Sequence, residues 1–165
     1  MRANKNLGHA AQLRGAYDRA AQLHQESLAH YPSDYHSGLL WAYHSLGETA
    51  LGVGRLDEAA RWLAQALTLS QALSDPAGTA WCLAGLGSVA ALDAVPERAA
   101  RLWGAAERQR QSIGCRTAPA ARATYERAMA QARAQLSEAT FAAAWEHGRA
   151  MKLEQAIAYA FGEGT

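Results

Sequence analysis

The fold is decided by residues 54–67, which read GRLDEAARWLAQAL and combine a tight turn with the start of an amphipathic helix. Near copies of its first seven residues occur on both sides, GAYDRAA at residues 15–21 and AVPERAA at residues 94–100. A Leu-Gly pair precedes each copy, at residues 7–8, 46–47 and 86–87, so one unit recurs about every 40 residues. A repeat of this length indicates an array of stacked helical units, each burying its apolar face against its neighbours.

The composition favours helices and argues against several kinds of partner. Alanine, the strongest helix former, supplies about a quarter of the residues, and no stretch alternates with a period of two, so no sheet is expected. The formal net charge of +1 gives no basic surface for nucleic acid. The sequence has neither the apolar core of a signal peptide nor an apolar run of membrane-spanning length. We therefore expect a cytoplasmic protein with no nucleic-acid or membrane partner.

Turn and capping signals divide the first two thirds of the chain into three helical hairpins. Pro32 ends a helix, Asp75 is an N-cap residue before Pro76 at the first helical position, and Gly114 ends the last helix of the array. The expected units are residues 1–34, 35–74 and 75–114. The expected helices within them are residues 2–14, 16–30, 35–53, 56–73, 76–92 and 96–113.

The remaining residues lack a turn like that at residue 54. They predict a helix over 117–136, a shorter helix capped by Ser137 with its end weakened by Gly148, and a last helix over 153–161. Terminal units of repeat arrays are atypical because one face meets water, so residues 117–162 are expected to form a capping unit within a single domain, residues 1–165.

Small residues recur where the two helices of each hairpin are expected to cross. They are Gly8, Gly47 and Gly87 on the first helices and Ala20, Ala59 and Ala99 on the second helices. Close crossings let the hairpins nest and stack. The predicted fold is an all-α, right-handed superhelix of three antiparallel hairpins with a C-terminal helical cap and a concave inner face.

These residues resemble the tetratricopeptide repeat. The Leu-Gly pairs, the turn at residues 54–59, the small residues Ser27, Ala66 and Ala106, and Pro32 carry the likeness, although the usual period is about 34. The tail, with AARLWGAAE at residues 99–107 and FAAAWEHGRAM at residues 141–151, is similar to the C-terminal end of sensor arms in bacterial signal-transduction ATPases with LuxR-type output domains. No phosphate-binding loop and no helix-turn-helix segment accompanies it, so the ATPase and DNA-binding parts of such regulators are absent from this sequence.

The resemblance implies a binding function and not an enzymatic one. The expected role is a scaffold or regulatory module that binds a protein or peptide on the concave face. One alternative is a sensor that binds a small-molecule effector inside the superhelix. Another is self-association as a homodimer through the first helix, whose outer side no preceding repeat covers.

In this family the first helix of each unit lines the concave face. The resemblance selects Lys5, Asn6, His9, Gln12, Trp41, His44, Ser45, Glu48, Trp81 and Ser88 as partner-binding residues, with Arg2 and Leu92 at further lining positions. Trp41 and Trp81 share one place in their units and are expected to form an aromatic ladder that anchors an apolar side chain or a cation. The alternative is that both tryptophans only pack between neighbouring first helices. Some repeats of this type clamp a C-terminal carboxylate, but of the clamp positions only Lys5 matches, so that ligand is not expected.

Metal and catalytic sites are not expected. His24, His30, His36 and His44 crowd one third of the chain, but their spacing does not suit a metal, and exposed or capping roles are expected for them. Cys82 and Cys115 are expected to be free thiols in a reducing cytoplasm, although antiparallel helices would bring the two near each other. No arrangement of nucleophile, base and acid is evident, so we expect no enzymatic activity and no cofactor.

Overall fold

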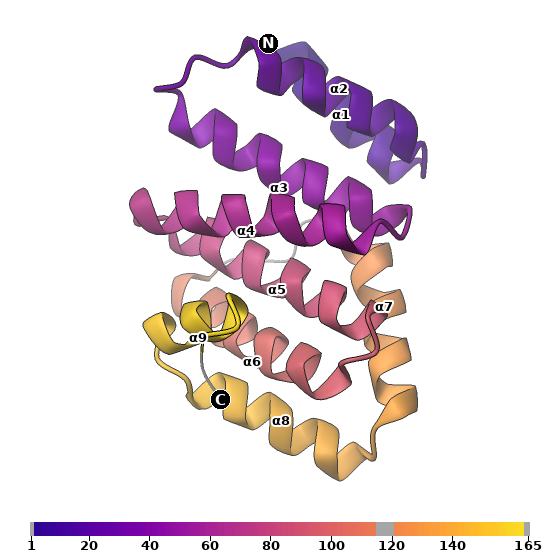
Figure 1. Ribbon diagram of the computed structural model, residues 1–165, viewed down its shortest axis with the longest axis vertical. Helices are drawn as coiled ribbons and strands as arrows, with labels where there is room; N and C mark the ends of the chain where they lie inside the picture. Colours follow the sequence, from indigo (N-terminus) through magenta and orange to yellow (C-terminus); the bar gives the residue numbers. More distant parts are fainter. Residues whose placement is uncertain (1, 115–120, 164–165) are drawn as a thin grey trace.

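The computed structural model describes residues 2–114 and 121–163, apart from the side chains of residues 2–5, and within these ranges it is helical and contains no strand. The helices are α1 (Arg2–Leu13), α2 (Tyr17–His30), α3 (His36–Gly52), α4 (Leu56–Ala72), α5 (Pro76–Leu92), α6 (Pro96–Ile113), α7 (Arg122–Gln135), α8 (Glu138–Ala150) and α9 (Leu153–Ala160). The first six make three antiparallel hairpins stacked along the long axis (Figure 1). The predicted all-α solenoid is confirmed, and the ends of α1 to α6 differ from the predicted ends by one residue at most. None of the described helices combines the length and apolar character needed to cross a bilayer.

The turns follow from a few local residues. Gly15 and Gly54 adopt positive φ angles of 74° and 77° at the bends inside the first two hairpins, a conformation that costs glycine little. Ala94 takes the equivalent place in the third hairpin with φ 57°, which strains a residue that carries a Cβ. Between hairpins, the Asp75 side chain accepts hydrogen bonds of 3.0 Å from the backbone N–H groups of Ala77 and Gly78, and so caps α5 as predicted.

Each hairpin is closed by a glycine that faces one large side chain. The glycine of each Leu-Gly pair lies against the residue sixteen positions later; the pairs are Gly8–His24, Gly47–Leu63 and Gly87–Trp103. A Cβ on Gly47 would lie 2.6 Å from Leu63 Cγ, and one on Gly87 would lie 2.7 Å from Trp103 Cδ1. The glycines therefore meet the side chains one helical turn beyond the fully buried alanines Ala20, Ala59 and Ala99, which the sequence had suggested as their partners.

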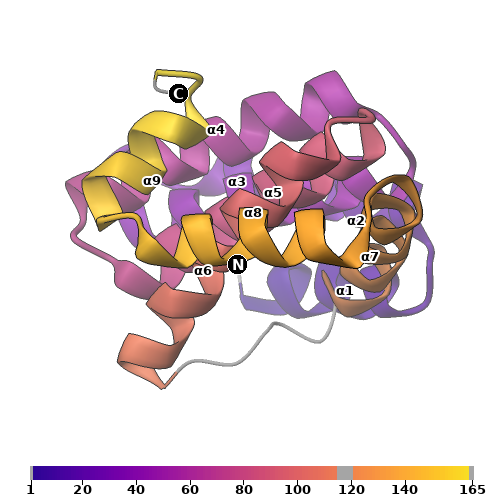
Figure 2. The same cartoon turned by 90° about the horizontal axis from the view of Figure 1, so that it is seen from below.

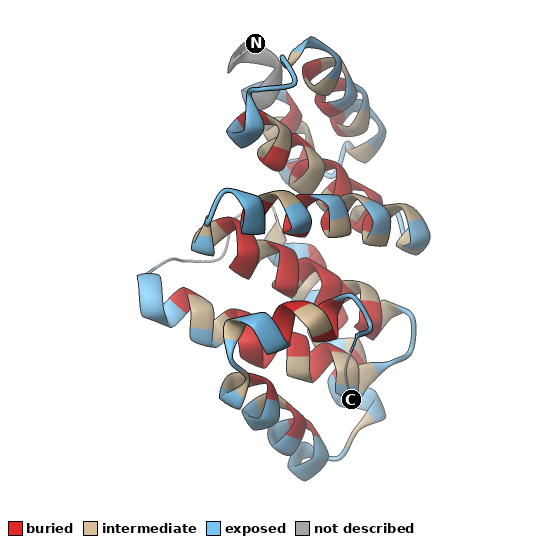
Figure 3. Ribbon diagram, turned by 60° about the vertical axis from the view of Figure 1, so that its left-hand side comes forward, coloured by how far each residue is buried: buried red, intermediate tan, exposed pale blue. Residues whose placement is uncertain are grey.

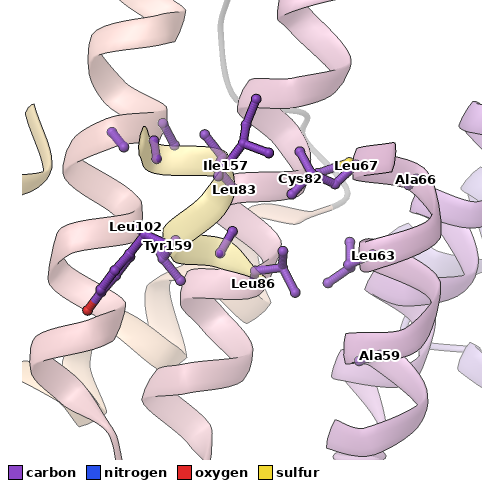
Figure 4. Close-up of a cluster of buried hydrophobic side chains, with 14 of the residues drawn as sticks. Ala59, Leu63, Ala66, Leu67, Cys82, Leu83, Leu86, Leu102, Ile157 and Tyr159 are labelled. Atoms are coloured by element: carbon purple, nitrogen blue, oxygen red, sulfur yellow. The ribbon is translucent and has the colours of Figure 1, made fainter. Parts of the chain in front are cut away.

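The core forms two neighbouring clusters. Figure 3 shows the buried positions along the helices, and Figure 4 shows the larger cluster. The larger cluster joins α3, α4, α5 and α6, and α9 seals it with Ile157 and Tyr159. The second cluster centres on the fully buried Trp103 of α6 and is covered by α7 and α8. Helix α5 contacts α3, α4, α6, α7 and α9, and most of its residues are buried.

The tail does not continue the array in the simple way expected of a cap. Helix α8 packs on α6, where the first helix of a next hairpin would lie, because Gly104 and Gly148 let the two backbones approach closely. Gly148 thus lies buried in the last turn of α8, two residues before the helix ends at Ala150. Helix α7 leaves the stack and contacts α3, α5 and α6, whereas α9 lies on the opposite side of the α5–α6 hairpin (Figure 2).

Candidate functional site

A cavity of about 100 Å³ opens on the inner side of the solenoid, where α1, α3 and α5 meet the start of α7. We call it the inner cavity; it is lined by His9, Gln12, Trp41, His44, Ser45, Glu48, Trp81 and Ala121. A smaller hollow adjoins it and shares three of these residues, His44, Glu48 and Trp81. Its other lining residues are Ala84, Gly85, Ser88, Arg110, Ala121 and Tyr125. The two hollows together combine aromatic walls with the polar side chains of His44 and Glu48.

A histidine and a glutamate from α3 form the centre of this site. His44 and Glu48 lie one turn apart, with His44 Nε2 3.9 Å from Glu48 Oε1, and their side chains are only 13% and 10% exposed. Burial lowers the pKa of His44 to about 4 and raises the pKa of Glu48 to about 7. Near neutral pH the imidazole is therefore uncharged, and the carboxyl is divided between its protonated and ionised forms.

The tryptophans supply the apolar walls of the inner cavity. Trp81 lies beside the His44 ring, with the ring centroids 5.8 Å apart, and Trp41 meets the His24 ring edge-on at 5.0 Å. Trp81 Nε1 is buried and finds no hydrogen-bond acceptor among the residues that the structure describes. A ligand with an acceptor at this point would therefore satisfy a donor that the protein leaves unused.

Other polar groups of the site hold helices together. Gln12 Nε2 donates hydrogen bonds to the Ser45 carbonyl oxygen at 3.1 Å and to Thr49 Oγ1 at 2.8 Å, which ties α1 to α3. Thr49 Oγ1 donates in turn to the same carbonyl oxygen at 2.7 Å. Ser88 Oγ donates to the Ala84 carbonyl oxygen within α5. These side chains have structural partners, so the groups with the least satisfied chemistry are Glu48 and the Trp81 indole.

The structure brings eight of the ten residues predicted for partner binding to these two hollows. His9, Gln12, Trp41, His44, Ser45, Glu48 and Trp81 line the inner cavity, and Ser88 lines the adjoining hollow. Asn6 is exposed on α1, and the side chain of Lys5 lies outside the described part of the chain. The role of all ten residues in partner binding stays a prediction. The adjoining hollow also contains residues that the sequence did not indicate; they are Ala84 and Gly85 of α5, Arg110 of α6, Ala121 and Tyr125. Ala121 and Tyr125 reach it because of the path of α7, which the repeat pattern does not specify.

Exposed or capping roles were expected for these histidines, but not all of them lie at the surface. His30 and His36 are exposed, but His24 is fully buried against Gly8, and His44 is largely buried. The expectation was wrong for His24 because it occupies the place that Leu63 and Trp103 fill in the other hairpins. Among the described residues, no three His, Cys, Asp or Glu side chains gather as metal ligands. Cys82 is buried and free, and Cys115 lies outside the described ranges.

Comparison with known proteins agrees with this architecture for the first two hairpins. A family model described as tetratricopeptide repeat matches residues 1–72, which supports a tetratricopeptide-repeat domain. No curated protein and no solved structure matches the chain. Tetratricopeptide repeats generally mediate protein–protein interaction and are typically non-catalytic scaffolds.

Proposed function

We propose that this chain is a protein- or peptide-binding module whose partner lies along the inner face of α1 and α3 and inserts a side chain into the inner cavity. The observation that carries the proposal is the hollow between Trp41 and Trp81, walled by two indoles beside a polar centre. Aromatic side chains around a desolvated pocket are the typical anchors of binding energy at protein interfaces. The tetratricopeptide-repeat match over residues 1–72 supports the same general function.

The available surface is shorter than in an open solenoid. Helix α7 contacts α3 and α5, and its residues Ala121 and Tyr125 close one side of the polar site. The free part of the inner face therefore belongs mainly to the first two hairpins. We expect a short segment that presents one anchoring side chain, and not a long helix lying in the whole groove.

We further propose that the module belongs to a cytoplasmic bacterial transcriptional or signalling regulator. The support is the likeness of residues 99–107 and 141–151 to the end of regulator sensor arms. In the structure these stretches include Gly104 and Gly148, through which α6 and α8 pack backbone to backbone. The likeness therefore falls on residues with a defined packing role. Expression of a reporter gene in the native host, with and without the chain, tests this context.

The binding proposal is tested by selecting peptides from a random library displayed on phage and measuring their affinity in solution. Trp41→Ala should weaken a selected peptide by at least about 30-fold, the loss expected for an interface anchor. Trp62→Ala is the matched control, because Trp62 is a half-buried tryptophan on α4 that does not line the inner cavity. A large loss of melting temperature for Trp41→Ala with unchanged peptide affinity would contradict the proposal and make Trp41 a packing residue.

Two other functions have one observation each in their favour. The inner cavity is small and polar enough for a small-molecule effector, and a thermal-shift screen against metabolites would reveal such a ligand. Leu7 and Leu13 on α1 are 54% and 57% exposed, which favours self-association through the first helix. Light scattering of the wild type and of a Leu7→Lys, Leu13→Lys double variant would detect that dimer.

A further inference from the structure

We propose that the inner cavity binds an alkylammonium head, held by the carboxyl of Glu48 between the indoles of Trp41 and Trp81. The source that fits the proposed function is a lysine side chain, methylated or not, on a bound peptide. A free amine of the same chemistry is the other source. This inference rests on the proposed use of the inner face and narrows it to one class of anchoring group.

The charge of the site favours a cation. Among the described residues that line the inner cavity, Glu48 is the acidic side chain, and neither a lysine nor an arginine is present. Its nearest partner for a charge interaction, His44 Nε2, is 3.9 Å away, beyond hydrogen-bond distance. A buried carboxylate without a cation is costly, so the empty site keeps a share of the carboxyl protonated. An ammonium group would stabilise the ionised carboxylate and remove that cost.

The walls and the size of the inner cavity favour the same group. The faces of tryptophan rings attract cations more strongly than those of other aromatic side chains, and two indoles are present. The volume of about 100 Å³ corresponds to roughly three water molecules, so it suits a compact head of a few non-hydrogen atoms. An anion would meet the Glu48 carboxylate, and a purely apolar group would leave that carboxylate without a partner.

Gly85 makes room for the carboxyl on the neighbouring helix. A Cβ at this position would lie 3.1 Å from Glu48 Oε1 and 2.9 Å from two atoms of Leu63. The carboxyl is therefore confined against α5 and has little freedom to turn into water. Confinement of this kind lowers the ordering cost of binding a ligand.

Binding of a cation should depend on pH, because the carboxyl must be ionised. The titratable and charged groups that line the two hollows with Glu48 or interact with it electrostatically are His9 of α1, His44 of α3, Cys82 of α5, Arg110 of α6 and Tyr125 of α7. Burial raises the pKa of Cys82 and of Tyr125 and lowers that of His44, so these three are uncharged between pH 6 and pH 8. The charge of Arg110 is paired with Glu107, whose Oε2 lies 2.6 Å away. With a pKa of about 7 for Glu48, the affinity should rise about tenfold from pH 6 to pH 8.

The test uses the full chain and follows the indole N–H signals of its five tryptophans by NMR. The probe is tetramethylammonium chloride, compared with tert-butanol as a neutral group of similar shape and with sodium chloride at equal ionic strength. Tetramethylammonium should shift the Trp41 and Trp81 signals saturably at pH 8 and about tenfold more weakly at pH 6. Tert-butanol should have no saturable effect.

Glu48→Gln keeps the size of the side chain and removes its charge, so it should weaken tetramethylammonium binding at least tenfold. Glu58→Gln is the matched control, because Glu58 Oε1 lies 3.5 Å from the indole nitrogen of Trp62 on α4, away from the inner cavity. The control should bind the probe as the wild type does. Equal binding by Glu48→Gln, equal binding of tert-butanol, or saturation without shifts of the Trp41 and Trp81 signals would each overturn the inference.

A second arm separates this inference from the proposed function. Selected peptides that lose affinity with Trp41→Ala are resynthesised with each lysine replaced by norleucine, which keeps the methylene chain and removes the charge. Loss of at least tenfold supports the lysine source. Unchanged affinity refutes cation binding while peptide binding on the inner face stands. Binding of tetramethylammonium without any peptide binder would refute the peptide function and assign the cavity to a free amine.

Discussion

Replacing His24 by leucine is expected to stabilise the protein. The His24 side chain is fully buried, and neither Nδ1 nor Nε2 finds a hydrogen-bond partner among the described residues. In the second hairpin the equivalent residue is Leu63, which packs on Gly47 as His24 packs on Gly8. Because the same architecture already accommodates leucine at this place, His24→Leu should fit without a cavity or a clash.

The size of the effect follows from the cost of an unsatisfied buried polar group, about 1–3 kcal/mol. One ring nitrogen of neutral histidine is a donor and the other an acceptor, and leucine removes both. We therefore expect the free energy of unfolding to rise by about 1–3 kcal/mol at pH 7. This should raise the melting temperature by about 2–4 °C per kcal/mol for a protein of this length.

The gain should increase in acid. Burial, with a smaller contribution from His9, lowers the pKa of His24 to about 4 from 6.5. The unfolded chain binds the proton more readily than the folded chain. The free energy of unfolding of the wild type is therefore undiminished by this titration above about pH 6.5 and falls as the pH drops towards 4. That loss is at most about 3 kcal/mol, and His24→Leu abolishes it.

Urea denaturation followed by circular dichroism at pH 7.5 and pH 5 measures both effects. His36→Leu is the matched control, because His36 is exposed and should change stability by less than about 0.5 kcal/mol at either pH. A His24→Leu protein less stable than the wild type at pH 7.5 would refute the claim that the imidazole is a cost. A gain of equal size at both pH values would refute its assignment as a titrating group.

Three further substitutions test the packing, the turns and the buried carboxyl by the same denaturation assay. Gly148→Ala should lower the free energy of unfolding by about 3 kcal/mol, because its Cβ would clash with an α6 backbone carbonyl. The control is Gly38→Ala, whose Cβ would meet only an exposed tyrosine ring, so the free energy of unfolding should change by less than about 1 kcal/mol. Ala94→Gly should raise the free energy of unfolding by about 0.5–1 kcal/mol by relieving the left-handed backbone at this residue, and Gly54→Ala should lower it by a similar amount. Variants as stable as the wild type would contradict the strain. The pKa of Glu48 is raised from 4.5 to about 7 in the folded protein. The contribution of protonated Glu48 to folding stability is therefore fully present below pH 4.5 and is lost as the pH rises through 7. Glu48→Gln should therefore gain about 1–3 kcal/mol relative to wild type between pH 5 and pH 8.5, and a constant difference would argue against a buried, titrating carboxyl.

The hairpins could be predicted from the sequence because their signals are local. Pro76 and Pro96 begin helices at the first helical position, Gly54 bends the chain, and Asp75 caps α5 with its own side chain. The burial of His24 was also within reach, since aligning the three repeats places it with Leu63 and Trp103. An exposed histidine was the expectation because histidine is less often fully buried than leucine. The place of His24 in the repeat, which matches that of two large apolar residues, indicates burial instead.

The path of α7 could not be predicted in this way. Its sequence specifies an amphipathic helix but not the surface that covers its apolar side. Ala128 and Ala132 are fully buried in the second core cluster, and Arg127 reaches the Leu51 carbonyl oxygen at 3.1 Å. These contacts join residues far apart in the chain, so they depend on where the stacked hairpins leave a complementary face. The lining of the polar site by Tyr125 follows from the same long-range packing.

The raised pKa of Glu48 follows from its burial by both the repeat and the tail. On an open inner face the carboxyl would be hydrated and ionised, whereas here it lies close to Gly85 of α5, and Tyr125 of α7 lines the same hollow. A carboxyl held in this way destabilises the free protein, and a cation that binds it recovers the lost free energy.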